Sequence, residues 1–294
     1  AYEILSSDWS SDVCSSDLVY QIDNIMALLA AFADARVLYF CERDTAAFFR
    51  NVSPEATIIE YDRDEQFLFS APFTHYSRAL AARHPEVAIL LERHPDPSLL
   101  SLMSRTGARY RIGYEDSGEF PFLNLRVRPT ADLTYLPEVN SSLARCLGAS
   151  LQGPIRWKVA GEAREGLDQL LGELGFGAST RLIGIDGPYF HGRFGESWTD
   201  RLLSQLREVS GYAFYCIPDR NASDGTLAWL KEHGLAIIPP VSLPRLTALI
   251  HRSRTLITGN TVNFQLARLL NSPAIGLFDR ASMDSYFKPS DLSR

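Results

Sequence analysis

The segment from Ser242 to Arg280 constrains the fold of this chain most, because it contains a complete helix–strand–turn–helix–strand pattern. Behind a serine start signal, apolar residues recur at the i, i+3, i+4 spacing of an amphipathic helix. TLIT (255–258) has the character of a short buried strand, and Gly259-Asn260-Thr261 predicts a tight turn. A second helix to about Leu270 and a strand over Pro273–Phe278 complete the unit. In a parallel sheet, such a turn presents the N–H groups of a helix start at the carboxyl end of a strand, which favours binding of a phosphate or diphosphate.

Strands and helices alternate through the rest of the chain as well. Predicted strands lie at 37–40, 56–61, 87–91 and 109–114 in the first half and at 181–186, 212–217 and 235–238 in the second, with helical patterns between them. Such alternation implies parallel, doubly wound sheets. Gly153-Pro154 interrupts the pattern and predicts a linker. We therefore expect an α/β fold of two Rossmann-like domains, 19–150 and 151–294, whose parallel sheets face a central cleft.

The first eighteen residues differ from the rest of the chain. AYEILSSDWSSDVCSSDL is rich in Ser and Asp, repeats SSD and shows neither strand nor helix period. It resembles the translated sequencing-library adapter that contaminates many metagenomic gene predictions. We therefore expect residues 1–18 to be artefactual and the native first strand to have been overwritten, which excludes this segment from fold prediction.

Composition narrows the class of protein. A formal net charge of −6 gives no global basic surface, so nucleic acid is not the expected partner. The longest apolar run, Ile25–Ala33, is too short to cross a bilayer, and no signal-peptide pattern occurs. Cys14, Cys41, Cys146 and Cys216 are scattered without CxxC spacing, as is typical of reduced thiols. These features predict a cytoplasmic protein.

From Asp17 to Pro289 the ordered motifs resemble those of family 9 glycosyltransferases, the ADP-heptose:lipopolysaccharide heptosyltransferase group. Ser16-Asp17 precedes the first helix where the family has Gly-Asp, and RTGARYRIGY (105–114) is similar to its Gly-Ala-Lys…Ile-Gly strand. LIGIDGPYF (182–190) stands where the family has a strand and a Pro-Gly turn, and Trp198 matches the tryptophan of its Lys-x-Trp-Pro element. The closing segment is similar to the family's Asp-Thr-Gly-x-x-His helix start and its Pro-Val-Val-x-Leu-Phe-Gly strand. The resemblance implies a GT-B-like fold.

Several chemical groups of the family are altered in this chain. Its Asp-Thr-Gly-x-x-His motif reads Asn-Thr-Val-Asn-Phe-Gln over residues 260–265, which keeps only the threonine. Val262 replaces a glycine that lets the backbone approach phosphate closely, and Gln265 cannot carry a positive charge. Glu196 replaces a lysine and would repel a diphosphate. His191 and Arg193, expected in the same loop, could supply positive charge instead.

The resemblance also assigns roles to individual residues. Asp17 aligns with the catalytic aspartate, the base that removes the acceptor hydroxyl proton; the alternative is an exposed foreign carboxylate. Arg105, Arg109 and Arg111 are expected at strand ends facing the cleft, where bidentate guanidinium groups would bind an anionic acceptor. Alternating arginines on a strand more often mark its solvent face. The implied donor-binding residues are Asp186, Gly187, His191, Arg193, Asn260, Thr261, Val262, Asn263 and Gln265.

Other motifs are weaker. Asp62-Arg63-Asp64 has the D-x-D pattern of metal-dependent glycosyltransferases, but a charged turn after a strand explains it as well, and we predict no metal. The histidines show no ligand spacing. The sequence contains no P-loop or G-x-S-x-G motif, and the Tyr-x-x-x-Lys pair of a nucleotide-sugar epimerase is absent.

These observations lead to two expectations about function. The first is an inverting glycosyltransferase that moves a heptose-like sugar from an ADP-heptose-like donor to a lipopolysaccharide core or a related anionic glycan or glycolipid, without a cofactor. It would act in the cytoplasm, with peripheral contact to the inner membrane. The second is a catalytically silent homologue that binds a glycan or nucleotide as an interaction protein. The resemblance further implies that the chain is truncated at both ends.

Overall fold

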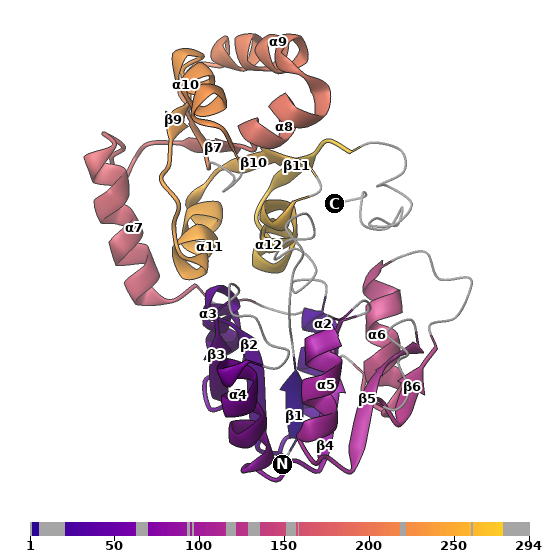
Figure 1. Cartoon of the computed structure of the whole chain (residues 1–294). Coiled ribbons are helices and arrows are strands. Elements are labelled where there is room, and N and C mark those ends of the chain that lie inside the picture. Colours follow the sequence, from indigo (N-terminus) through magenta and orange to yellow (C-terminus); the bar gives the residue numbers. More distant parts are fainter. Residues whose placement is uncertain are drawn as a thin grey trace. The chain divides into compact units, whose positions relative to one another are not determined.

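The computed structural model describes residues 2–5, 21–62, 70–92, 95, 97–115, 122–128, 136–150, 157, 159–217, 222–259 and 261–278. The chain divides near residue 155 into two compact units, each with its own parallel sheet covered by helices (Figure 1). Every described strand pairing is parallel. The α/β class with parallel sheets, predicted from the alternation of strands and helices, is therefore confirmed.

The first unit contains a sheet with the strand order β3-β2-β1-β4-β5-β6. From β1 the chain adds β2 and β3 on one side. It then crosses to the other side of β1 and adds β4, β5 and β6, so the direction of winding reverses between the neighbouring strands β1 and β4. The strands are β1 (Tyr2–Leu5), β2 (Val37–Glu42), β3 (Thr57–Tyr61), β4 (Val87–Leu90), β5 (Tyr110–Tyr114) and β6 (Leu125–Val127).

Strand β1 lies within residues 1–18, the segment that was excluded from fold prediction. The backbone of Tyr2–Leu5 lies in the centre of the first sheet and pairs with β2 on one side and β4 on the other. Four residues are too few to display a strand period, so the sequence pattern did not reveal this strand. Its place depends on two neighbouring strands, which only the tertiary structure brings together.

Helices cover both faces of the first sheet. Leu38 and Phe40 of β2 and Leu90 of β4 join α4 and α5 in one hydrophobic cluster, whereas Tyr39 points the other way and stacks on Phe49 of α3 at 4.3 Å between ring centroids. This alternation is the period of a strand that is buried on both faces. The helices are α2 (Ile22–Ala31), α3 (Arg43–Val52), α4 (Ala71–Ala81), α5 (Pro97–Arg105) and α6 (Leu136–Cys146), with α2 packed against α6.

The second unit contains a sheet with the strand order β11-β10-β7-β8-β9. The chain runs outward from β7 through β8 and β9, and then returns to β10 on the opposite side of β7. The direction of winding therefore reverses between β7 and β10. The strands are β7 (Leu182–Ile185), β8 (Ala213–Cys216), β9 (Ala236–Ile237), β10 (Thr255–Thr258) and β11 (Ala274–Gly276).

Two hydrophobic clusters flank the second sheet. Helices α7 and α11 pack with Leu182 and Tyr215 on one face, and α8, α9 and α10 pack with Ile185 and Cys216 on the other. Figure 1 shows α12 beside α11, and α8, α9 and α10 beyond the opposite face. The helices are α7 (Gly161–Glu173), α8 (Gly187–Phe194), α9 (Glu196–Arg207), α10 (Asp224–Glu232), α11 (Leu243–Arg252) and α12 (Val262–Leu270).

Candidate functional site

The carboxyl ends of β7 and β10 form the candidate site of the second unit. Ile185, the last residue of β7, pairs with Ile257 of β10, and the Asp186 amide donates to the Ile257 carbonyl at 3.0 Å. Asp186 and Thr258 therefore lie side by side at the same edge of the sheet. Because the winding reverses between these two strands, this edge is the topological switch point at which open α/β sheets bind their ligands.

A single carboxylate oxygen organises the residues at this switch point. Asp186 Oδ2 accepts hydrogen bonds from the hydroxyls of Thr258 and Thr261, each at 2.6 Å, and from Asn263 Nδ2 at 3.1 Å. The two threonine hydroxyls are themselves 2.9 Å apart. Asp186 is buried, so these donors replace the water that the carboxylate loses. They connect the end of β7 to the turn between β10 and α12.

Helix α12 begins at this carboxylate. Thr261 is its N-cap residue, and Val262 and Asn263 form its first turn. The first N–H groups of a helix have no intrahelical partner, and the helix dipole favours negative charge next to them. The β10–α12 turn therefore combines amide donors for an anion with a buried acidic side chain of the protein.

Two glycines at this edge contact neighbouring side chains. A Cβ atom on Gly259, directly after β10, would overlap the ring of Tyr189 in α8. A Cβ on Gly187 would lie 2.9 Å from the Leu230 methyl groups and 3.3 Å from Cys216 Sγ. Both positions therefore need glycine for packing within the protein.

The negative charge of Asp186 also affects the sheet below it. Burial raises the pKa of Cys216 to about 12; the charge of Asp186 adds to this rise, and a backbone hydrogen bond at Gly187 opposes it. Burial likewise raises the pKa of Tyr215, whose hydroxyl lies 2.9 Å from Ser253 Oγ. Both side chains stay neutral at physiological pH and serve as core residues.

The structure brings part of the predicted donor-binding set together. Asp186, Thr261 and Asn263 share the hydrogen-bond cluster, and Val262 opens α12 next to them. Gln265 is buried one turn later and accepts from Arg268 Nη1 at 3.0 Å. Asn260 lies outside the described residues. Thr258 belongs to the cluster but was not predicted, because as the last residue of a strand it carries no motif signal.

His191 and Arg193 lie in a different kind of segment from the one expected. Both were expected in a loop, but they belong to helix α8, which begins with Gly187-Pro188 and ends before Gly195. Proline is favoured at a helix start, and the φ of +82° at Gly195 stops the helix there. The His191 ring packs on Trp229 of α10 at 5.3 Å between centroids.

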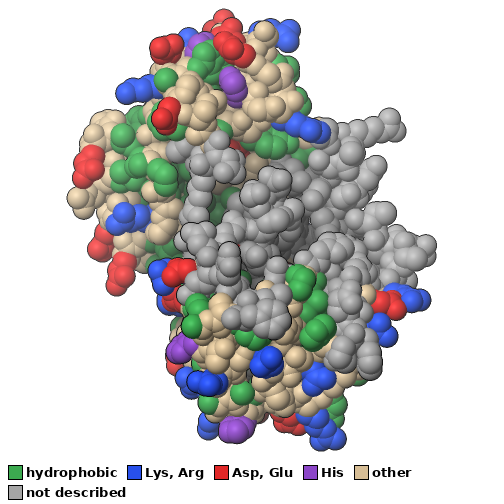
Figure 2. All heavy atoms as spheres, viewed as in Figure 1, with side chains coloured by type: hydrophobic (Ala, Val, Ile, Leu, Met, Phe, Trp, Pro, Cys, Tyr) green, Lys and Arg blue, Asp and Glu red, His purple; other side chains and the backbone are tan. Residues whose placement is uncertain are grey.

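The predicted acceptor-binding arginines lie at the amino edge of the first sheet. Arg105 ends α5 with its guanidinium over the Phe73 ring, and Arg109 precedes β5 with its guanidinium over Tyr110. Helix α5 returns the chain to the amino edge before β5 begins, so neither residue follows the carboxyl end of a strand. Figure 2 shows separate basic side chains, divided by other surface, on the visible face of this unit.

Arg111, the third of these arginines, is engaged within the protein. Its guanidinium donates to the Phe122 and Ala108 carbonyls at 2.8 and 3.0 Å. These bonds tie β5 to the chain before β6. Acceptor binding by the three arginines stays a prediction.

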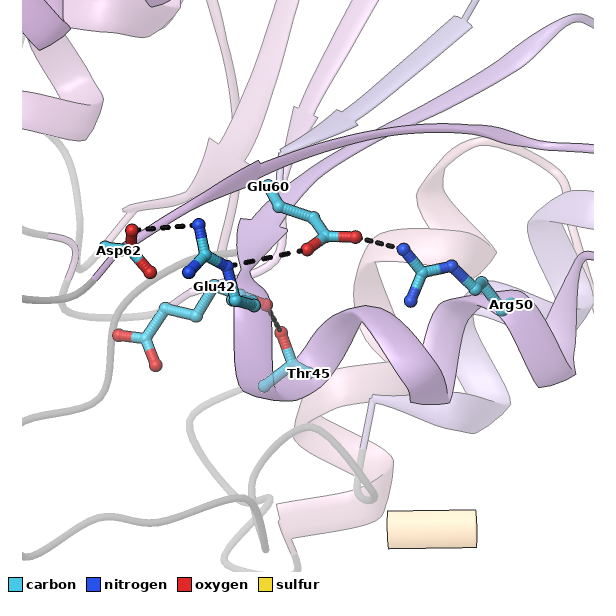
Figure 3. A network of polar contacts seen from close by, with 6 residues as sticks. Glu42, Thr45, Arg50, Glu60 and Asp62 are labelled. Atoms are coloured by element: carbon cyan, nitrogen blue, oxygen red, sulfur yellow. Dashed lines mark hydrogen bonds and ion pairs between the residues drawn. The ribbon is translucent and has the colours of Figure 1, made fainter. Parts of the chain in front are cut away.

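Asp62 of the D-x-D pattern takes part in an ion-pair network at the carboxyl edge of β2 and β3. Its carboxylate lies 2.9 Å from Arg43 Nη2, and Glu60 contacts both Arg43 and Arg50 (Figure 3). Arg43 therefore already pairs with Asp62, the carboxylate of this pattern that lies within the described residues. The described residues contain no group of three possible His, Cys, Asp or Glu metal ligands. Asp64 and the predicted base Asp17 lie outside the described residues.

Comparison with known proteins identifies the fold. No family model and no curated protein matches the sequence. Among solved structures, the family 9 glycosyl transferase from Veillonella parvula DSM 2008 aligns with a TM-score of 0.72 at 14% identity, over 95% of this chain and 82% of its own. ADP-heptose LPS heptosyltransferase II from E. coli aligns with a TM-score of 0.71 at 15% identity, over 97% of this chain and 86% of its own. The structure of E. coli heptosyltransferase WaaC with ADP aligns with a TM-score of 0.68 at 14% identity, over 96% of this chain and 89% of its own.

The chain therefore has the GT-B-like fold of family 9 glycosyltransferases and heptosyltransferases, as the sequence motifs predicted. At these identities the likeness establishes the fold, and activity has to be argued from the site. No helix in the described ranges combines the length and apolar character that crossing a membrane requires.

Proposed function

We propose that this protein is a glycosyltransferase that binds a nucleotide-diphosphate sugar at the carboxyl edge of its second sheet. The observation that supports this most directly is the cluster around Asp186, which fixes the start of α12 at the switch point between β7 and β10. One solved structure of the same fold was determined with ADP. The donor's diphosphate would accept hydrogen bonds from the first amides of α12.

The chemistry follows from this placement. A glycosyl transfer releases a nucleoside diphosphate, whose developing negative charge the α12 amides would stabilise without a metal. The donor is proposed to be ADP-heptose-like and the acceptor a lipopolysaccharide core or related anionic glycan. A general base would deprotonate the acceptor hydroxyl as its oxygen attacks the anomeric carbon and the bond to the diphosphate breaks, and this single displacement inverts the anomeric configuration. Acceptor class, stereochemistry and action in the cytoplasm at the inner membrane are proposed from the family resemblance alone.

The alternative proposal is a catalytically silent protein that binds a nucleotide or glycan. It is favoured by one observation at the site: Asp186 already takes the side chains of Thr258, Thr261 and Asn263, and it adds a negative charge where a diphosphate would approach. An anion would then depend mainly on backbone donors.

Two measurements separate the two proposals. The first is calorimetric titration with ADP and ADP-heptose, and the second is an assay for ADP release with a heptose-deficient lipopolysaccharide acceptor. Binding with acceptor-dependent ADP release is expected for the transferase. Binding without release would favour the silent protein. If neither ligand binds, the transferase proposal fails, and so does nucleotide binding by a silent protein.

A charge variant makes the titration more specific. Glu196 is exposed at the first position of α9, where the family resemblance expects a lysine. Glu196→Lys should raise ADP affinity severalfold at low salt, and the gain should shrink as salt screens the added charge. Glu208→Lys, at the other end of the same helix, changes the net charge equally and serves as the matched control.

A further inference from the structure

The ring of Tyr189 fills the space that Gly259 leaves at the β10–α12 turn. A Cβ on Gly259 would overlap three ring atoms, Cε1, Cζ and Cδ1. Gly259 is buried and is not among the described glycines with positive φ, so its backbone conformation does not require glycine. The residue is small because the tyrosine ring lies against it.

This contact has a consequence for ligand binding. In phosphate-binding turns, a glycine after the strand allows a phosphate to approach the backbone closely. Here an aromatic ring occupies the side-chain face of that glycine. The ring and a phosphate group cannot take the same position, so they compete for one face of the turn.

Two aromatic rings of α8 pack against the ring of Tyr189. It lies in the first turn of α8, and its ring makes edge contacts with Phe190 and Phe194 at 5.6 and 6.4 Å between centroids. Its side chain is only partly buried. The structure therefore gives the ring a packed position over Gly259 and leaves part of it accessible.

We propose that the ring of Tyr189 restricts the donor site, because it covers the Gly259 face of the β10–α12 turn and thereby lowers the affinity for diphosphates. The inference rests on the proposed donor site. A nucleoside diphosphate binds against Gly259 only when the ring has moved away, and with the ring in place it contacts α12 from the Thr261–Val262 side.

Truncation of the ring tests this directly. Tyr189→Ala should bind ADP and inorganic pyrophosphate about five- to tenfold more tightly than the parent protein, because the competent state no longer has to displace the ring. Tyr189→Phe keeps the ring and should bind like the parent. Phe194→Ala removes a partly buried ring of similar size from the same helix and should leave both affinities unchanged.

A second substitution keeps the test independent of folding defects. Gly259→Ala should destabilise the parent strongly and should be tolerated much better in the Tyr189→Ala background, since the overlapping ring is then absent. The unfolding midpoint of each variant in urea measures this coupling.

The outcomes separate this inference from the proposed function. If the parent binds ADP and Tyr189→Ala binds it equally or more weakly, the role of Tyr189 is refuted while the donor site stands. An equal gain in Phe194→Ala would refute it too, because general loosening of α8 would then explain the change. If no variant binds ADP or pyrophosphate, the donor site itself is wrong, and the role of Tyr189 is refuted with it.

Discussion

The Thr258 hydroxyl lies 2.6 Å from Asp186 Oδ2, which joins the ends of two strands that are 72 residues apart in the sequence. Both residues are buried, so this hydrogen bond does not depend on a flexible surface side chain. The bond fixes the relative height of β7 and β10 at their carboxyl ends. Since α12 begins four residues after Thr258, the same bond sets where the helix start lies.

Removing the Asp186 carboxylate should destabilise the protein through the donors it leaves behind. Asp186→Ala removes the acceptor that Thr258, Thr261 and Asn263 share, and we expect it to lower the free energy of unfolding by about 3 kcal/mol. Asp186→Asn keeps an acceptor oxygen without the charge and should cost about 1 kcal/mol. Urea unfolding measures both, with Asp168→Ala on the exposed side of α7 as the control. Equal losses in the two Asp186 variants would contradict the shared-acceptor arrangement.

Gly184, in the middle of β7, should tolerate no side chain. An added Cβ would lie 2.5 Å from Leu256 Cδ1 and from the Tyr215 hydroxyl oxygen, both of which are buried. We expect Gly184→Ala to lower the free energy of unfolding by about 3 kcal/mol through overpacking. Gly192→Ala in α8 meets nothing within 4 Å and should stabilise the protein by up to about 1 kcal/mol, because alanine is the better helix former. Thermal unfolding of the pair should therefore shift in opposite directions.

Stability should fall at alkaline pH because two cysteine thiols are buried. Burial raises the pKa of Cys41 and of Cys216 from 9.0 to about 12. In the unfolded chain these thiols ionise near pH 9, whereas the folded protein keeps them protonated. The stabilisation is therefore complete below pH 9 and is lost as the pH rises from 9 towards 12, by up to about 1.4 kcal/mol per pH unit for each thiol.

Denaturant unfolding under reducing conditions from pH 8 to 10.5 measures this slope. Cys216→Ala should reduce it by the contribution of one thiol, and Cys146→Ala, at an exposed position, should leave it unchanged. Stability that stays flat between pH 8.5 and 10.5 would show that the two thiols are not buried as described.

Local patterns predicted most of the elements but few of the contacts at the site. The apolar spacing of α11, the short apolar run of β10 and the helix start at Thr261 are all readable over a few residues. The pairing of Thr258 with Asp186 is not, because it requires β10 to return beside β7 after β8 and β9 have formed on the other side.

The turn signal had a similar limit. It located Gly259 as the start of a turn that could bind phosphate, but it could not show that Tyr189 occupies the space beside it. His191 and Arg193 were expected in a loop, whereas helix α8 contains both and ends at Phe194. The contact of Tyr189 with Gly259 depends on packing of α8 against the end of β10, and these two elements lie more than sixty residues apart in the sequence.

The position of β1 gives the most direct test of the first unit. Ile4 pairs with Tyr39 of β2 and with Ile89 of β4, so its backbone lies in the middle of the sheet. Ile4→Pro removes a backbone donor from a central strand, and we expect it to lower the stability of the first unit by about 3 kcal/mol or more. Thr57→Pro, at the first residue of the edge strand β3, is the matched control and should cost much less. Hydrogen exchange measured by mass spectrometry should show lost protection in β2 and β4, with β7 and β10 unaffected. If Ile4→Pro leaves exchange and unfolding unchanged, Tyr2–Leu5 is not the central strand, and the adapter-like start of the chain has no part in the native sheet.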